Sequence, residues 1–201
     1  GMGLPAIKAD PAPVLPVLAV LRSDPSEVVR RSVANNLNDI SKDHPDLVVE
    51  VLDEWSDGSP EMDALTKHAS RTLLKRGHPG ALQLHGFSPA PQVELVAATV
   101  RPASAAIGDS VVLEVELLST VADNQPLMVD YAVVFQNASG TGTRKVFKGV
   151  VAELEPGGTL AMRRKISLAQ QSTRRIIPGP HSVEIQVNGA IVAQAHFDVS
   201  G

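Results

Sequence analysis

The chain has 201 residues, of which 43% are hydrophobic and 20% charged, a composition typical of folded domains and not of disordered chains. It contains no cysteine, which excludes disulfides, thiolate metal ligands and cysteine nucleophiles, and its 3% of aromatic residues are too few for a base-stacking surface. The formal net charge of −4 argues against a protein that coats nucleic acid or membrane with its whole surface, and no apolar run reaches the roughly 18 residues of a membrane span.

The first part of the chain, up to about residue 87, repeats its apolar residues with the period of helices. Prolines that follow a capping or turn residue mark the expected helix starts: Asp10-Pro11, Asp24-Pro25, His44-Pro45, Ser59-Pro60 and His78-Pro79. Helices are expected over 11–22, 25–41, 45–56, 60–76 and 79–84. These prolines recur at intervals of 34 or 35 positions, so the sequence predicts two-helix repeats stacked into an α-solenoid.

From residue 92 onward the apolar pattern alternates, as in half-buried strands. Strands are expected over 92–99, 110–118, 128–136, 144–152, 159–168, 181–187 and 191–198. Asn188-Gly189, between the last two, is a strong hairpin signal. Short strands in this number and spacing predict an immunoglobulin-like β-sandwich. We therefore expect two domains, a helical one over residues 1–88 and an all-β one over residues 89–201.

Basic and amide side chains gather on the second helix of each predicted pair. Arg31, Asn35, Asn38 and Lys42 follow the spacing of one helix face, and Lys67, Arg71 and Lys75 form the matching stripe at i, i+4 and i+8. Equivalent helices of a solenoid line one surface, so the two stripes predict a concave positive strip that faces a polyanion. The alternative is an ordinary solvated helix face, on which lysine and arginine are common.

Asp39 is the one carboxylate beside this face, and it is the single candidate for a catalytic residue. A carboxylate next to a cationic strip can stabilise positive charge that develops on a substrate. The alternative is an ion pair with Arg31 or Lys42.

The predicted sandwich carries a second basic cluster. Between residues 144 and 175 eight basic residues oppose Glu153 and Glu155: Arg144, Lys145, Lys148, Arg163, Arg164, Lys165, Arg174 and Arg175. This cluster fits a second phosphate-contacting surface, and it fits equally well the charges that keep sheet edges from pairing.

No catalytic or nucleotide-binding motif with a fixed spacing occurs, such as G-x-S-x-G, H-E-x-x-H or G-x-G-x-x-G. The six histidines are scattered without ligand spacing, so we expect neither a metal nor another cofactor. The chain does not start with a basic segment followed by an apolar core, so no secretory signal is expected and a cytoplasmic location is predicted.

Residues 29–45, VRRSVANNLNDISKDHP, resemble the AlkC branch of the AlkC/AlkD superfamily, the bacterial HEAT-like-repeat DNA alkylation repair glycosylases. The resemblance continues through residues 71–77 to residues 86–87, and it covers roughly residues 10–87. Some members of that branch append an immunoglobulin-like domain, which fits residues 92–200. The resemblance thus implies a two-domain fold: HEAT-like α-solenoid repeats followed by an immunoglobulin-like β-sandwich.

The resemblance implies a protein that binds alkylated duplex DNA on the concave helical face, in a family that hydrolyses the N-glycosidic bond of methylated bases. Arg30 and Arg31 match the family as phosphate contacts, whereas the sister AlkD branch has a DNA-contacting tryptophan where this chain has Asn35. The DNA-binding candidates are then Arg30, Arg31, Asn35, Asn38, Lys42, Lys67, Arg71 and Lys75.

Family members carry further helical repeats before residues 29–45, so this chain is expected to match their C-terminal part. Whether the chain is itself an enzyme therefore stays open at this point. The alternative function is a non-catalytic interaction module of HEAT-like repeats and an immunoglobulin-like domain, in which the latter binds a protein partner.

Overall fold

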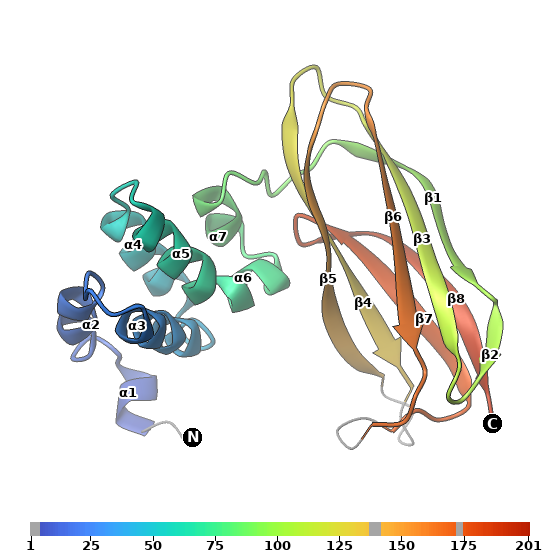
Figure 1. The fold of residues 1–201 in the computed structure, drawn as a ribbon, viewed down its shortest axis with the longest axis horizontal. Helices are drawn as coiled ribbons and strands as arrows, with labels where there is room; N and C mark the ends of the chain where they lie inside the picture. Colours follow the sequence, from blue (N-terminus) through green and yellow to red (C-terminus); the bar gives the residue numbers. More distant parts are fainter. Residues whose placement is uncertain (1–4, 137–141, 172–174) are drawn as a thin grey trace. The chain divides into compact units, whose positions relative to one another are not determined.

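The computed structural model describes residues 5–136, 142–171 and 175–201. The chain divides into two compact units, Gly1–Gly86 and Phe87–Gly201, the first helical and the second built of strands (Figure 1). Each unit has its own cluster of buried hydrophobic residues. Within the described ranges, no helix combines the length and the apolar composition that crossing a bilayer requires.

The first unit contains helices of five to fourteen residues. They are α1 (Pro5–Ala9), α2 (Leu15–Leu21), α3 (Glu27–Ile40), α4 (Pro45–Trp55), α5 (Pro60–Ala69), α6 (Arg71–Arg76) and α7 (Pro79–Leu84). Three of the expected helix-starting prolines do open a helix, at the first residues of α4, α5 and α7. Proline fits there because its missing N–H has no partner in the first turn and its φ is already helical.

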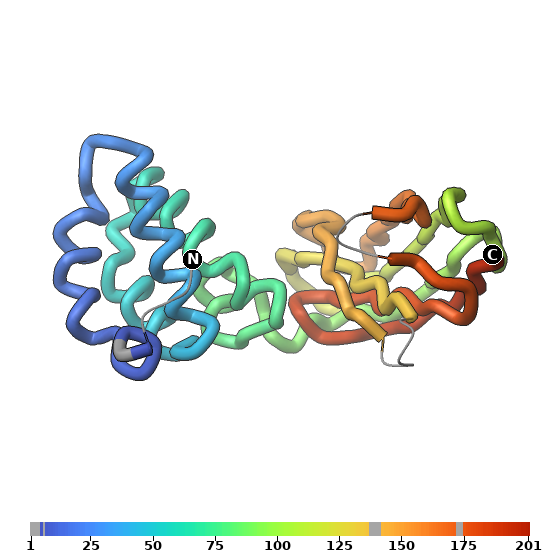
Figure 2. Tube along the Cα trace, turned by 90° about the horizontal axis from the view of Figure 1, so that it is seen from below, coloured from blue at the N-terminus to red at the C-terminus, as the bar shows by residue number. Residues whose placement is uncertain are grey.

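The core of this unit lies between α3, α4 and α5. Leu37 and Leu52 are fully buried, and Trp55 at the end of α4 is 5% exposed with the Arg22 guanidinium 5.1 Å from its ring centroid. Figure 2 shows α3 lying between α2 and α5, and the residue contacts agree, since α3 packs chiefly against α5. This packing brings the outer faces of α3 and α5 side by side.

The expected HEAT-like α-solenoid is wrong. The unit is a group of short helices in which only α3, α4 and α5 reach ten residues among those described. The spacing of the prolines is also followed only in part, because Pro11 and Pro25 open no helix: α2 begins at Leu15 and α3 at Glu27.

One predicted helix, over 60–76, is divided at Ser70. The fully buried Ser70 hydroxyl donates to the Thr66 carbonyl at 2.7 Å and lies 2.7 Å from His85 Nε2. A serine hydroxyl that bonds back to the carbonyl four residues earlier often bends a helix. The backbone hydrogen bonds from Ser70 N–H to the Thr66 carbonyl and from Leu74 N–H to the Ser70 carbonyl are still made, both at 2.9 Å, whereas the Thr72 N–H bonds to Asn38 Oδ1. α5 ends at Ala69 and α6 begins at Arg71.

The second unit is a two-sheet sandwich. Its strands are β1 (Val93–Arg101), β2 (Ser104–Ala106), β3 (Ser110–Ser119), β4 (Gln125–Phe135), β5 (Thr143–Leu154), β6 (Thr159–Ser167), β7 (Gly179–Val187) and β8 (Ala190–Ser200). One sheet has the order β1-β3-β6 and the other β2-β8-β7-β4-β5. The expected strands overlap all of these except β2, which is too short for an alternating pattern to be recognised.

Alternation along the strands builds the sandwich core. In β3, Val111, Leu113 and Leu117 are fully buried, while Glu114 and Glu116 between them are exposed. Side chains of a strand point to opposite faces in turn, so this pattern places one face of the sheet against its partner sheet.

The hairpin predicted at Asn188-Gly189 is confirmed. Both residues have positive φ, 46° and 79°, as a two-residue type I′ turn between β7 and β8 requires. Asn188 is buried, and its Oδ1 accepts a hydrogen bond from the Met128 N–H at 2.8 Å while its Nδ2 donates to the Ser88 carbonyl at 2.8 Å. This asparagine thus closes the hairpin and ties it to β4.

Candidate nucleic-acid interface

The start of α3 is fixed by the turn before it. Asp24 Oδ1 accepts the Ser26 N–H at 2.8 Å, and Arg30 Nη1 donates to the carbonyls of Asp24 and Pro25 at 2.8 and 3.0 Å. The helix itself begins at Glu27, two residues later than expected. Arg30 Nη1 is therefore already engaged by backbone carbonyls of the chain itself.

Four polar residues meet where α3, α5 and α6 come together. Arg31 and Asn35 lie on α3, His68 on α5 and Arg71 at the first position of α6, and we call them the junction cluster. His68 Nε2 lies 2.8 Å from Asn35 Oδ1, and Arg71 Nη1 donates to Asn35 Oδ1 and to the His68 carbonyl, both at 3.1 Å. The two predicted basic stripes are thereby joined at one place.

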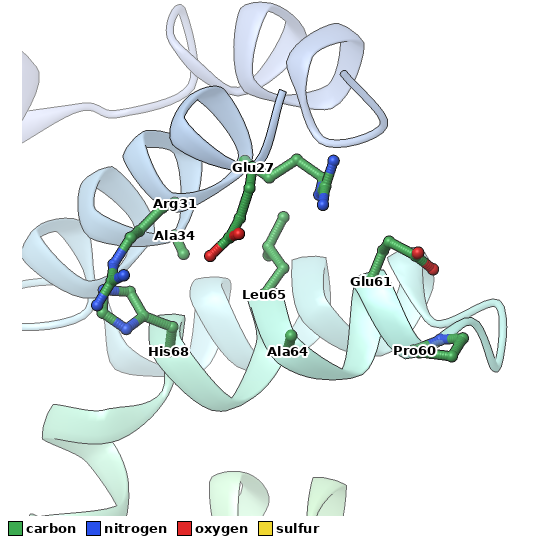
Figure 3. A pocket seen from close by; sticks show the side chains of 9 residues that line it. Glu27, Arg31, Ala34, Pro60, Glu61, Ala64, Leu65 and His68 are labelled. Atoms are coloured by element: carbon green, nitrogen blue, oxygen red, sulfur yellow. The ribbon is translucent and has the colours of Figure 1, made fainter. Parts of the chain in front are cut away.

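Arg31 belongs to this cluster by proximity and charge. Figure 3 shows its guanidinium beside the His68 ring. Burial lowers the pKa of His68 below its ordinary value near 6.5, and the positive charges of Arg71 and then Arg31 lower it further. Arg31 and Arg71 therefore lie on the same side of the helical unit, with His68 between them.

A pocket of about 310 Å3 runs between α3 and α5 next to the junction cluster (Figure 3). Its ionisable lining residues are Glu27, Arg30, Arg31, Glu61 and His68, and its apolar ones include Ala34, Ala64 and Leu65. Figure 3 shows Arg31 and His68 at one end and Glu61 at the other, with the Glu27 carboxylate between them. Arg31 is thus the cation at the junction end of the pocket, and Arg30 adds a second cation toward the start of α3.

Asn38, a predicted DNA contact, is not on this surface. It is 2% exposed, and its Oδ1 accepts a hydrogen bond from the Thr72 N–H at 3.2 Å. That N–H belongs to the first turn of α6 and has no partner within its own helix. Asn38 therefore holds α6 against α3.

Lys42 and Asp39 bind each other at the end of α3. Lys42 Nζ donates to Asp39 Oδ1 at 2.6 Å, and both side chains are about half exposed or more. The Lys42 carbonyl in turn accepts from Arg76 Nη1 at 3.4 Å. The only catalytic candidate of the sequence is thus an exposed carboxylate with a lysine partner.

Lys67 and Lys75 lie on different helices, because the division at Ser70 separates them. Both are exposed, and Lys67 is close enough to His85 to lower the pKa of that histidine after the larger effect of burial. The structure therefore brings Arg31, Asn35 and Arg71 together, and it leaves Lys67 and Lys75 as separate exposed charges.

His68 has no place among the residues that the sequence singles out. Histidines were expected to be scattered, and His68 does not fall in the i, i+4 stripe. One signal was available: His68 follows Asn35 by 33 residues, close to the interval of 34 or 35 between the helix-starting prolines. Residues separated by that interval lie on neighbouring helices.

In the sandwich, several charges of the second basic cluster have partners. Arg144 pairs with Glu184 at 2.7 Å and Arg163 with Glu114 at 3.2 Å, while Arg164 donates to the carbonyls of Arg163 and Gly149. Arg174 lies outside the described residues. These arginines thus bind groups of the sandwich itself, and the strands that carry them, β5 and β6, lie at the edges of their sheets, which favours the edge-protecting interpretation.

The described residues hold no group of three or more histidine, aspartate or glutamate side chains arranged to bind a metal ion.

Comparison with known proteins places the chain in a family. A family model described as the C-terminal Ig-like domain of the uncharacterised protein YhaZ matches residues 94–201, more than half of the chain. The chain belongs to this YhaZ family. Protein YhaZ of Bacillus subtilis (strain 168) is 39% identical over 199 residues, which are 99% of this chain and 55% of that protein.

A solved structure matches the whole chain. The alkylpurine DNA glycosylase AlkC of Pseudomonas fluorescens, bound to DNA that contains an abasic site analog, superimposes with a TM-score of 0.96 at 35% identity. The match covers 100% of this chain and 56% of AlkC. This YhaZ-family chain therefore spans about half the length of the relatives it matches. The resemblance to AlkC and the Ig-like domain, both predicted from the sequence, are confirmed.

Proposed function

We propose that this chain is the duplex-DNA-binding part of a DNA alkylation repair protein. The observation that carries the proposal is the likeness over the whole chain to AlkC, a glycosylase whose structure contains DNA. The junction cluster supports it, because two arginines from different helices lie together on an exposed seam. Arginine is well suited to phosphate, since its planar fork donates two parallel hydrogen bonds. Such a role implies a cytoplasmic location, where the bacterial chromosome lies.

Fewer residues are proposed to contact DNA than the eight candidates predicted from the sequence. Arg31 and Arg71 are the main phosphate contacts, with Lys67 and Lys75 as further charges on the neighbouring helices. Asn35 contributes as a hydrogen-bonding residue between them. The other three candidates already have partners within the chain. Asn38 bonds to α6, Lys42 pairs with Asp39, and Arg30 bonds to the turn before α3.

The substrate class proposed for the longer family members is duplex DNA with a methylated, positively charged base. Such a base is a good leaving group, so the enzyme must chiefly hold the duplex and stabilise the positive charge that develops on the sugar. We assign that second task to no residue of this chain, because Asp39 is exposed and paired with Lys42. Base release is therefore proposed for the longer proteins, and DNA binding for this chain.

The test of DNA binding is a salt titration with a fluorescent duplex, using Arg31→Ala. Among the described residues, Arg31 has neither a hydrogen bond nor an ion pair, so its loss should leave the fold intact. We expect weaker binding and a slope of log affinity against log salt that is less steep by about 0.9, the value for one lost phosphate contact. Lys8→Ala is the matched control, because Lys8 is an exposed cation in α1.

An affinity for DNA that changes neither with salt nor with Arg31→Ala would contradict the proposal. It would favour the alternative, an interaction module with a protein partner. A second assay separates binding from catalysis: the chain is incubated with methylated duplex DNA, and released base is measured by chromatography. No release is expected from this chain alone. Release above the level of DNA without protein would show that the chain is a glycosylase by itself.

A further inference from the structure

We infer that the junction cluster is a proton-linked phosphate site, in which one backbone phosphate of duplex DNA binds between Arg31, His68 and Arg71 while His68 takes up a proton. The inference rests on the proposed function, that the chain binds duplex DNA. It goes further by naming the residue that makes this binding depend on pH.

The first argument is the shortage of acceptors in the cluster. Asn35 Oδ1 is the one side-chain oxygen there, and it lies within hydrogen-bonding distance of both Arg71 Nη1 and His68 Nε2. Arg71 Nη1 and His68 Nε2 also lie within hydrogen-bonding distance of each other. Arginine only donates, so His68 Nε2 cannot both donate to Asn35 and accept from Arg71.

An anion resolves this conflict. If His68 Nε2 carries a proton, two donors face each other, this N–H and the Arg71 N–H. If His68 Nε2 carries none, two acceptors face each other, this nitrogen and Asn35 Oδ1. A phosphate oxygen that enters between His68 and Arg71 supplies the second acceptor, so that each donor gains its own partner. Charge-assisted hydrogen bonds of this kind are shorter and stronger than neutral ones.

The second argument is that the cations still have donors to offer. Arg71 uses Nη1 for its contacts, and within the described ranges its Nε and Nη2 have no partner. Arg31 is exposed and is likewise without a hydrogen bond or ion pair there. His68 and Arg71 are half-buried and Asn35 is exposed, so a phosphate can reach the cluster from solvent.

The charges around His68 come from each of the helices that meet there. Arg31 and, farther along the pocket, Glu27 and Arg30 lie on α3, Glu61 lies at the start of α5, and Arg71 lies on α6. Glu61 precedes His68 by two helical turns, about 10 Å along the axis. The nearest charges are therefore Arg31 and Arg71, and both are positive.

The direction of the pH effect follows from these neighbours. In the free chain, burial and the two arginines keep the pKa of His68 below its ordinary value, so the ring is neutral near pH 7. A bound phosphate adds a negative charge and an acceptor, both of which raise the pKa of His68. DNA affinity then rises as the pH falls through the bound-state pKa, and it levels off below the free-state pKa.

The experiment measures affinity for a fluorescent duplex between about pH 8 and pH 5 at constant salt, the range in which histidine changes charge. We expect affinity to rise on acidification by at most about tenfold per pH unit, the limit for one proton. His68→Gln keeps a polar side chain that cannot be charged, and it should flatten this rise. His44→Gln, the same substitution at the start of α4, should leave the rise unchanged.

A second readout follows the His68 ring by NMR, in the free chain and with the duplex bound. The inference requires a higher pKa for this ring in the complex. An unchanged ring pKa, or a pH dependence of binding that persists in His68→Gln, would overturn the inference while leaving DNA binding intact. If no form of the chain binds duplex DNA at any pH, the proposed function fails first and the inference with it.

Discussion

Protonation has different consequences for two histidines of the helical unit, His85 and His68. His85 lies 2.7 Å from the buried Ser70 hydroxyl, and its pKa is lowered by burial first and by Lys67 second, against a smaller opposing effect of Asp63. A neutral imidazole has the Ser70 hydroxyl as its hydrogen-bond partner here, whereas a protonated imidazole would hold a charge in a partly buried place, which is unfavourable. His85 is therefore a structural group that resists protonation, in contrast to His68 on the exposed seam.

This makes the helical unit sensitive to acid. The folded pKa of His85 is below the unfolded value near 6.5, so below that pH the unfolded state binds more protons than the folded state. We expect the free energy of unfolding to fall as the pH drops below about 6.5 and to stop falling once the pH is below the folded pKa. Urea unfolding followed by the fluorescence of the single tryptophan, Trp55, reports on this unit.

His85→Gln should remove part of that acid sensitivity, because glutamine can meet the Ser70 hydroxyl without being charged. His196→Gln is the control, since His196 is exposed and belongs to β8 of the sandwich. An equal loss of stability on acidification in the wild type and in His85→Gln would contradict the assignment.

At the scale of elements, Asn38 makes the buried link between α3 and α6. Asn38→Ala removes the buried acceptor of the Thr72 N–H and leaves this half-buried donor without its partner. We expect the free energy of unfolding to decrease by about 1–3 kcal/mol, the cost of such an unsatisfied group. The measurement is urea unfolding monitored by Trp55 fluorescence, with the salt slope of DNA binding measured on the same sample.

Asn36→Ala serves as the control, because Asn36 is exposed and its side chain, as far as the structure describes the chain, bonds only to the Ser32 carbonyl of the same helix. The salt slope should stay the same in Asn38→Ala as long as the chain is folded. If Asn38→Ala instead weakens DNA binding at unchanged stability, Asn38 contacts DNA after all, as its spacing in the sequence predicts.

The sequence predicts elements well where one local pattern decides them. Alternation in β3 and the Asn188-Gly189 turn are local features, and prolines 45, 60 and 79 open helices for a local steric reason. The division at Ser70 could not be predicted, because it involves His85, fifteen residues away. Three-residue β2 is too short to show alternation.

Asn38 shows why the site is harder to predict than the elements. The buried face of α3 comprises Val33, Ala34, Leu37 and Asn38. Asn38 follows Ala34 by four residues, so it continues an inner row, yet a polar residue is assigned to the outer face when only apolar letters define the core. His68 was not predicted as a site residue for a related reason: its role comes from contacts with Asn35 and Arg71, which lie on other helices.

At the scale of the whole molecule, a net charge of −4 and DNA binding are compatible if binding is local. Outside the junction cluster, several basic side chains are already paired, such as Lys42 with Asp39 and Arg144 with Glu184. Paired cations release few counterions when DNA approaches, because a carboxylate already neutralises them. The long-range field of the chain is therefore weakly negative, while a small seam between three helices is positive.

This distribution predicts how steeply DNA binding depends on salt. Each neutralised phosphate contributes about −0.9 to the slope of log affinity against log salt. The one phosphate held between Arg31, His68 and Arg71 therefore gives a slope of about −1, and further phosphates at Lys67 and Lys75 bring it to about −3. The measurement is a salt titration of duplex binding near pH 7, with Arg31→Ala making the slope less steep by at most about one.

Other slopes have distinct meanings. A slope near zero contradicts phosphate binding by the chain. A slope steeper than about −5 at neutral pH means that more cations take part than the helical seam offers. Lys148 and Lys165, which have no ion pair or hydrogen bond among the described residues of the sandwich, are then the next to replace by alanine, because Arg144 and Arg163 are held by Glu184 and Glu114.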